Sequence, residues 1–220
     1  VEEPEVHLQQ KQRDAEAGNT SSFFEIFGPG VWLTTLRTAI LATGTQGGYY
    51  AITTWLPTYL KTEQHLSVVG TGGYLAVIIA GSYAGYLCGA FLSDRFGRKL
   101  NFIAFSIASM AIALVYTRVP MSNALLLVLG FPLGFFASGI FAGMGAFMTE
   151  LFPTRIRGSG QGFCYNFGRA VGATFPFLIG FVAQKMALGV AIGTFAAAAY
   201  GVVILAALTL PETRGAQLES

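Results

Sequence analysis

The sequence predicts an all-α membrane protein with six transmembrane helices, and three observations lead to this fold class. Only 11% of the 220 residues are charged and 53% are hydrophobic, whereas a soluble domain normally carries about 25% charged residues. The apolar residues come in continuous blocks rather than in the stripes of amphipathic helices or strands. The charged residues gather in short segments between these blocks. A soluble protein with an unusually large buried core is the alternative interpretation.

Six apolar blocks are each about 17 to 30 residues long, enough for a helix to cross a hydrocarbon layer of about 30 Å. In lipid, only helices and closed barrels satisfy all of their backbone groups, and these blocks lack the alternating polarity of barrel strands. We therefore expect each block to form one helix. The predicted spans are Val31–Leu60, Gly70–Leu92, Leu100–Tyr116, Ala124–Thr149, Gly160–Ala183 and Leu188–Leu210.

Lysine and arginine residues predict the orientation of these spans. The segments on one side hold only Lys61, Arg118 and Lys185. The segments on the other side hold nine such residues, namely Lys11, Arg13, Arg37, Arg95, Arg98, Lys99, Arg155, Arg157 and Arg214. Because cytoplasmic loops carry the excess of positive charge, we expect both ends and both densely charged turns to lie in the cytoplasm, with the spans in the cell (inner) membrane.

The polarity of the chain divides it into three parts. Residues 1–21 are polar and charged and predict a disordered cytoplasmic linker, residues 22–210 hold the six spans, and residues 211–220 form a cytoplasmic tail. Ser22 is placed to cap a short helix whose phenylalanines would lie in the membrane interface. An irregular lead-in to the first span is the alternative.

Glycine recurs every four residues in several spans. Gly81, Gly85 and Gly89 lie on one face of the second span, and Gly168 with Gly172 repeats the spacing in the fifth. Such faces let helix backbones approach closely in lipid, where no hydrophobic force joins helices; they can also let helices slide or tilt. Pro132 and Pro176 fall inside predicted spans and are expected to bend them.

Two of the predicted cytoplasmic turns mix acidic and basic residues. "SDRFGRK" at 93–99 joins the second and third spans, and "TELFPTRIRG" at 149–158 joins the fourth and fifth. Asp94 ends a predicted helix, where its charge meets the negative end of the helix dipole and needs a cation opposite. Since both turns lie on the same side, they can form an ion-pair network between helix ends, although one exposed pair alone contributes only about 0–1 kcal/mol.

Three motifs resemble those of the major facilitator superfamily. "GAFLSDRFGRK" resembles the loop signature of that superfamily, "ELFPTRIRG" resembles the turn between its tenth and eleventh helices, and "PETRG" at 211–215 resembles the closing motif of its sugar-porter-like branch. The resemblance implies the carboxy-terminal six-helix half of a twelve-helix transporter, with the amino-terminal half as its partner. It also implies a cytoplasmic gate that stabilises the outward-open state, formed by Asp94, Arg95, Arg98, Glu150 and Arg157.

The first span carries one row of candidate substrate-binding residues. Gln46, Tyr50, Thr53 and Pro57 follow one another at spacings of four, three and four, on one helical face. The segment loosely resembles the substrate-lining seventh helix of sugar porters, but the paired glutamines and the asparagine of that motif are absent. We therefore infer no sugar from it.

The fifth span carries the second row. Tyr165 and Arg169 are four residues apart, with Asn166 beside them, and Arg169 would lie about 13 Å along a helix that begins near residue 160. An arginine at that depth costs about 2.5–3.5 kcal/mol on insertion scales and needs a partner. No Asp or Glu lies inside the predicted spans. The partner is therefore an anionic substrate, a group in the amino-terminal half, or the gate, if the side chain extends to the cytoplasmic surface.

These features predict a secondary transporter that works by alternating access. "QGGYYAITTWLPTYL" and "FCYNFGR" resemble segments of bacterial metabolite–proton symporters of the sialate and organic-acid kind. The expected substrate is a small organic anion such as a monocarboxylate or a sialate-like acid, with a proton as coupling ion whose carboxylate lies in the amino-terminal half. A sugar or polyol porter and a non-transporting membrane protein are the alternatives.

Other function classes find little support in the sequence. His7 and His65 lie outside the spans, and no nucleophile–base pair or metal-ligand cluster is apparent, so we expect no enzyme, no cofactor and no metal site. A net charge of +2 without a basic patch argues against nucleic-acid binding. The expected partners are a small-molecule substrate, a proton, the lipid bilayer and the amino-terminal half.

Overall fold

The computed structural model describes residues 22–215 as a bundle of helices. The predicted linker at 1–21 and the tail residues 216–220 lie outside the described residues. The elements, in chain order, are η1 (Phe23–Phe27), α2 (Trp32–Thr62), α3 (Val68–Phe96), α4 (Arg98–Arg118), α5 (Asn123–Gly139), α6 (Met144–Glu150), η2 (Thr154–Ile156), α7 (Arg157–Gly172), α8 (Phe175–Val182) and α9 (Leu188–Thr209).

The prediction of six helical spans is confirmed, and two of the spans are interrupted. α2, α3, α4 and α9 are each one helix, whereas α5 and α6 share the fourth span and α7 and α8 share the fifth. By length and composition, four segments of the described chain are apolar enough to cross a membrane: Val68–Phe96, Arg98–Arg118, Asn123–Glu150 and Leu188–Thr209. The first and fifth spans contain more polar residues, and these two spans carry the predicted substrate-binding residues.

The interruptions are short turns at small residues. After α5 the chain tightens, because the N–H groups of Phe141 and Ala142 donate to the carbonyls three residues earlier, at 3.1 and 3.2 Å. α7 ends in a similar way, with the Thr174 N–H donating to the Val171 carbonyl at 3.0 Å. The bends expected at Pro132 and Pro176 stay predictions, and the two prolines differ in their positions. Pro176 lies in the first turn of α8, but α5 continues past Pro132.

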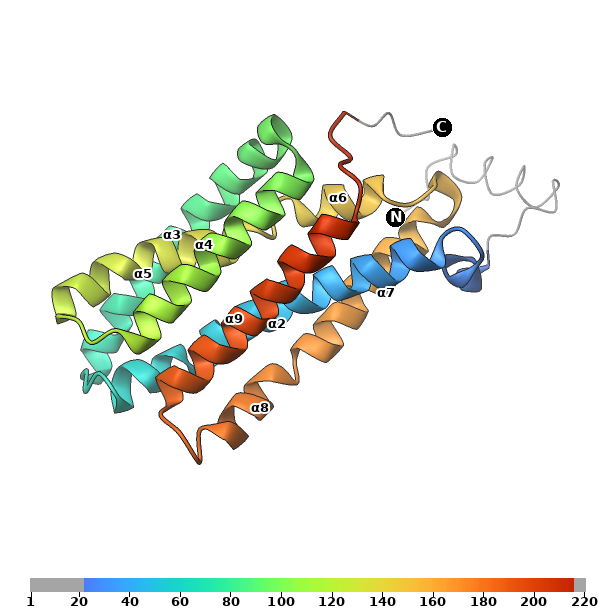
Figure 1. Ribbon diagram of the computed structural model, residues 1–220. Helices are drawn as coiled ribbons and strands as arrows, with labels where there is room; N and C mark the ends of the chain where they lie inside the picture. Colours follow the sequence, from blue (N-terminus) through green and yellow to red (C-terminus); the bar gives the residue numbers. More distant parts are fainter. Residues whose placement is uncertain (1–21, 216–220) are drawn as a thin grey trace, which may run out of the picture.

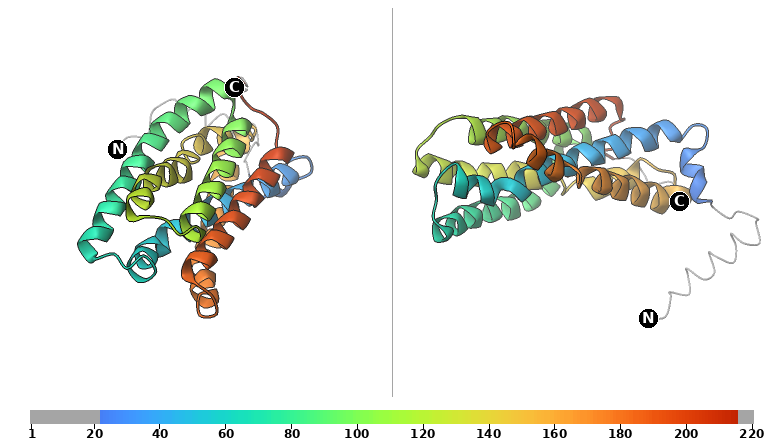
Figure 2. Two further views of the ribbon diagram at one scale, coloured as in Figure 1. Left: turned by 60° about the vertical axis from the view of Figure 1, so that its left-hand side comes forward. Right: turned by 90° about the horizontal axis from the view of Figure 1, so that it is seen from below.

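Two central helices organise the bundle. α2 packs against α7 and α9, α9 packs against α4, and α4 packs against α5, which lies along α3. Figure 1 shows α2 and α9 crossing the middle of the bundle, with α3, α4 and α5 on one side and α8 on the other. Figure 2 shows from two further directions that the long helices run along a common axis. The turns at 97 and 151–156 therefore lie at the same end.

Glycines set the distance between α3 and α5, as their spacing predicts. A Cβ on Gly81 or Gly85 would lie 2.1 Å from the carbonyl oxygen of Phe131 or Phe135, and a Cβ on Gly134 would lie 2.0 Å from that of Ile78. In α7, a Cβ on Gly168 would lie 2.6 Å from the Ala42 backbone of α2. The backbones of these helix pairs are therefore in direct contact, with no room for a side chain between them.

The exposed faces of the bundle differ in polarity. In their middle parts, α4 and α9 expose apolar side chains such as Ile107, Val115 and Leu205, which suit lipid. α7 exposes polar side chains within its span, namely Tyr165, Asn166 and Arg169. We call the side of α7 that carries these three residues the polar face.

The short helix η1 forms as its cap predicts. Ser22 accepts a hydrogen bond from the Phe24 N–H, while Glu25 accepts one from the Ser22 N–H at 2.9 Å, and together they form a capping box. Ile26 is fully buried, and its carbonyl accepts a bond of 2.6 Å from the Thr35 hydroxyl of α2. Phe23, Phe24 and Phe27 stay exposed beside this anchored residue.

The contact between α3 and α5 gives a first prediction. Gly85→Ala forces a methyl group against the Phe135 carbonyl, and such overpacking should destabilise the protein by about 1–3 kcal/mol. Thermal unfolding of the full-length protein in detergent measures the change as a lower Tm.

Gly73→Ala is the matched control in the same helix, because nothing lies within 4 Å of its Cβ position. Alanine favours helix over glycine by about 1 kcal/mol, so this variant should keep or raise the Tm. Equal Tm values for the two variants would show that the close contact is not present.

Candidate functional site

The charged turns meet around one arginine. The Arg98 guanidinium forms ion pairs with Asp94 and with Glu150, donating to the Glu150 carboxylate at 3.1 Å from Nη2 and 3.3 Å from Nε. Its Nη1 also donates to the Ser93 hydroxyl at 3.2 Å. The side chains of Arg98 and Glu150 are only 13% and 15% exposed, while that of Asp94 is 69% exposed. The Arg98–Glu150 pair is thus shielded from water and the Asp94 pair is not.

Gly97 makes this arrangement possible. It separates α3 from α4 with a φ of +110°, a backbone conformation that residues with a side chain rarely adopt. A Cβ at this position would also lie 2.6 Å from the Glu212 carboxylate. Glycine is therefore required at this position for two reasons: its positive φ and the close approach of the Glu212 carboxylate.

The tail after α9 completes the cluster. The Glu212 carboxylate accepts hydrogen bonds from the backbone N–H groups of Arg98, at 2.8 Å, and Lys99, at 3.1 Å. These N–H groups lie in the first turn of α4 and have no partner within the helix. The buried Thr213 hydroxyl donates to Glu150. We call Asp94, Arg98, Glu150, Glu212 and Thr213 the Arg98 cluster.

Lys99 makes the reciprocal contact with α9. Its Nζ donates to the carbonyls of Leu208, at 2.9 Å, and Leu210, at 3.1 Å, at the carboxyl end of that helix. A cation at this end of a helix is favourable. The sequence analysis identified the "PETRG" motif but predicted no contacts for Glu212, Thr213 or Lys99. The position of the motif directly after the last span is the feature that could have indicated these contacts.

Arg95 and Arg157, the other two predicted gate residues, lie beside the Arg98 cluster and make different contacts. The Arg95 guanidinium stands 5.9 Å from the centre of the Phe96 ring. Arg157 donates to the Thr149 carbonyl at 2.9 Å and to the Thr154 hydroxyl at 3.1 Å. In the described part of the chain, neither forms an ion pair.

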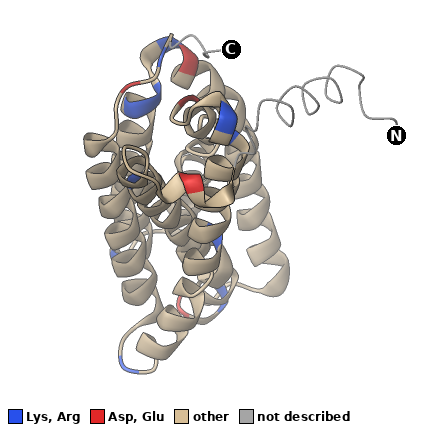
Figure 3. Ribbon diagram, turned by 90° about the vertical axis from the view of Figure 1, so that its right-hand side faces the viewer, with Lys and Arg blue, Asp and Glu red and all other residues tan. Residues whose placement is uncertain are grey.

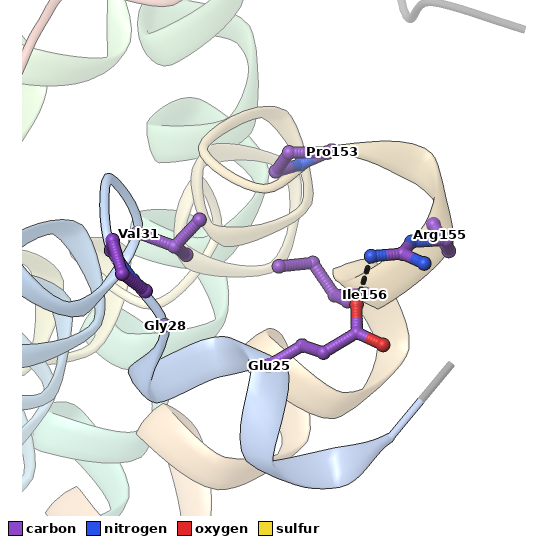
Figure 4. Close-up of a pocket in the computed structure, with 7 residues that line it drawn as sticks. Glu25, Gly28, Val31, Pro153, Arg155 and Ile156 are labelled. Carbon is purple, nitrogen blue, oxygen red and sulfur yellow. Dashed lines mark hydrogen bonds and ion pairs between the residues drawn. The ribbon is translucent and has the colours of Figure 1, made fainter. Parts of the chain in front are cut away.

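The same end of the bundle holds a third ion pair, between Glu25 of η1 and Arg155 of η2. Both residues line a cavity of about 260 Å³ that also contacts Val31, Pro153 and Ile156 (Figure 4). Figure 3 shows acidic and basic segments side by side at this end of the bundle. The structure therefore brings the turns at 94–99 and 150–157 to one end, as the charge pattern requires.

The predicted substrate-binding residues on α2 lie at different depths. Gln46 is 2% exposed, and its Nε2 donates to the Tyr165 carbonyl at 2.9 Å, which joins α2 to α7. Thr53 donates to the Tyr49 carbonyl at 2.8 Å within its own helix. Tyr50 is half-buried. Gln46 thus holds the site together, and Tyr50 and Thr53 remain partly open.

The predicted residues on α7 are exposed on the polar face. Tyr165 is 38% exposed, and Asn166 donates to the Gly162 carbonyl at 2.8 Å. Arg169 is exposed and, within residues 22–215, its side chain makes neither a hydrogen bond nor an ion pair. It lies one turn beyond Tyr165, close to the interruption at 173–174. Interrupted helices commonly line the central sites of transporters.

Comparison with known proteins agrees with the motifs. The sequence profile described as sugar (and other) transporter matches residues 2–220. A probable 4-methylmuconolactone transporter of Cupriavidus pinatubonensis is 37% identical over 83% of this chain and 42% of its own length. A cis,cis-muconate transport protein of Acinetobacter baylyi is 33% identical over 79% of the chain and 42% of its own length.

A sialic acid transporter of Escherichia coli is 28% identical over 66% of this chain and 36% of its own length. The chain thus spans less than half the length of these relatives. The match to the family covers almost all of the sequence and includes the three motifs, the six helical spans and the Arg98 cluster. The chain therefore belongs to the sugar (and other) transporter family, within the major facilitator superfamily.

Proposed function

We propose that this chain is the carboxy-terminal six-helix half of a secondary transporter that takes up a small organic anion by alternating access. The single observation that carries the proposal is Arg169, exposed on the polar face of α7 and unpaired among residues 22–215. A helix that spans a membrane does not leave such a cation without a partner, because burying it costs about 2.5–3.5 kcal/mol on insertion scales.

The remaining candidates for that partner lie outside the described residues. The acidic side chains of the described chain stand at helix ends or in turns, where Asp94, Glu150 and Glu212 surround Arg98 and Glu25 pairs with Arg155. Arg169 lies about 18 Å from Arg157 along α7, at about 1.5 Å per residue. Its side chain contacts none of these acidic side chains. An anionic substrate, held with Tyr50, Thr53, Tyr165 and Asn166, satisfies Arg169 in the assembled transporter.

The relatives support a carboxylate as that anion. Their names give 4-methylmuconolactone, cis,cis-muconate and sialic acid as substrates, and muconate and sialic acid are carboxylates at neutral pH. A sugar or polyol porter is the second candidate of the same family, and competition of uptake by carboxylates or by neutral sugars separates the two.

Proton coupling requires a titratable group within the membrane. The described spans contain no Asp or Glu away from their ends, so we assign the coupling carboxylate to the amino-terminal half. From the excess of lysine and arginine on one side of the spans, we place both ends of this chain in the cytoplasm of an inner-membrane protein, with residues 1–21 as the central linker and residues 211–220 as the tail.

The Arg98 cluster is proposed as the cytoplasmic gate. Its groups come from α3, α4, α6 and the tail, so it ties together four segments that must separate from, or meet, the amino-terminal half during each cycle. Because the Asp94 pair is exposed and the Glu150 pair is shielded, Asp94 is the member that exchanges most readily between partners.

Arg169→Ala should abolish uptake of the organic anion, because the variant removes the cation that binds the carboxylate. The full-length protein in proteoliposomes provides the measurement, with membrane insertion checked separately. Arg118→Ala is the matched control, since Arg118 contacts Thr194 at the opposite end of the bundle. Normal uptake by the Arg169 variant would exclude the anion site.

Asp94→Asn should shift the populations of inward-facing and outward-facing molecules without preventing folding, because it removes one exposed ion pair worth about 0–1 kcal/mol and leaves the Glu150 pair. Accessibility of engineered cysteines to a membrane-impermeant reagent reports the two populations. Lys61→Gln changes a charge at the other end of α2 without removing an ion pair of the described chain and should leave the populations near those of the wild type. Equal shifts in both variants would contradict a specific role for Asp94.

A further inference from the structure

A cavity large enough for a small organic acid lies at the end of the bundle opposite the Arg98 cluster. It is a groove of about 550 Å³ between the last turns of α2 and the first turns of α3, and small-molecule sites usually measure about 300–1,000 Å³. Its lining includes Pro57, Thr58 and Lys61 from α2, and Val68, Gly72 and Leu75 from α3. We call this cavity the Lys61 groove.

The Lys61 groove continues the row of predicted substrate-binding residues on α2. That row is spaced by four, three and four residues, and Lys61 follows its last member, Pro57, after four more. Residues at these spacings lie on one face of a helix. Lys61 therefore belongs to the same face, about 12 Å beyond Thr53 at about 1.5 Å per residue. Because Pro57 belongs to the row and also lines the groove, the two are continuous.

The charge of Lys61 is not neutralised within the described chain. Its side chain is exposed and forms no ion pair with any residue of 22–215. The acidic residue nearest to it in sequence, Glu63, has another role, because its carboxylate accepts hydrogen bonds from the N–H groups of Leu188 and Gly189 at the start of α9. A carboxylate that caps a helix is already engaged. Lys61 is therefore available to an anion that enters the groove.

The groove offers donors for a carboxylate and an apolar side for a carbon chain. Thr58 lies one turn before Lys61 on α2, so its hydroxyl and the lysine ammonium group can donate to one carboxylate. Val68 and Leu75 form the apolar side on α3. Gly72 lies between them and leaves space, since nothing stands within 4 Å of its Cβ position. The arrangement suits a small molecule with a charged end and a carbon skeleton.

We propose that the Lys61 groove is a second binding site for the organic anion, separate from the site at Arg169. This inference rests on the proposed function, because it takes the transported solute to be an organic anion. Lys61 binds the carboxylate, and the row on α2 leads from there to Gln46, which contacts α7, the helix of Arg169. The groove raises the local concentration of the anion at one end of that row. Because Lys61 is exposed, the binding weakens as salt concentration rises.

The test isolates the groove in full-length protein that carries Arg169→Ala, which removes the proposed central site. Titration calorimetry at low ionic strength measures the dissociation constant of cis,cis-muconate with the purified protein. The Arg169→Ala protein should still bind muconate. Adding Lys61→Gln should weaken this binding by about 10-fold, the loss expected for one charge-assisted hydrogen bond. Lys61→Arg keeps the charge and should retain the binding.

Two glycine variants in the same background test the space in the groove. Gly72→Leu extends a side chain into the groove from an open Cβ position and should weaken muconate binding by about 10-fold. Gly73→Leu is the matched control, because its Cβ position is equally open but the residue does not line the groove. Leucine favours helix over glycine, so neither variant should lower the Tm.

Four outcomes would overturn the inference. They are no muconate binding by the Arg169→Ala protein, unchanged binding after Lys61→Gln, equal effects of Gly72→Leu and Gly73→Leu, and displacement of muconate by added phosphatidylglycerol. The last result would show that the groove holds a lipid headgroup. Failure of the proposed function is seen separately: normal uptake by Arg169→Ala in proteoliposomes excludes the anion site at Arg169 and leaves muconate binding in the Lys61 groove unaffected.

Discussion

The structure depends on helix backbones that touch one another directly. In lipid, apolar side chains gain nothing by leaving the hydrocarbon, so helices associate through close packing and polar contacts. Along α3 and α5 the contact is so close that added methyl groups would fall 2.0–2.1 Å from carbonyl oxygens of the opposite helix. This contact fixes the position of α3, and with it the Asp94 end of that helix.

Polar groups act at two levels of the bundle. At one end, the Arg98–Glu150 pair and the tail join α3, α4 and α6 through charges that are partly shielded from water. Near the middle, Gln46 joins α2 to α7 through one hydrogen bond, and Arg169 on the same helix pair stays open. The charges at the end of the bundle hold α3, α4 and α6 together. The charge of Arg169, in contrast, lies on an exposed face where the described chain offers it no partner.

The sequence was sufficient to predict the six spans, the common end of the two charged turns and the glycine contacts, because each follows from length, charge or spacing within one segment. It could not place Glu212, which lies 114 residues from Arg98 along the chain. Nor could it choose among Arg95, Arg98 and Arg157 as partners of Glu150, since their spacings are equally suitable. The interruption at 140–143 was also missed, because the sequence there stays apolar while the hydrogen bonding changes.

Lys99 and Glu212 form a reciprocal pair of helix caps with a mechanical effect. Glu212, just beyond α9, binds the first N–H groups of α4, while Lys99, in the first turn of α4, binds the last carbonyls of α9. Each helix thus supplies the charge that neutralises the other's dipole. Any motion that parted these ends would expose two dipoles at once. If other helices of the bundle move relative to one another, α4 and α9 should move together as one rigid body.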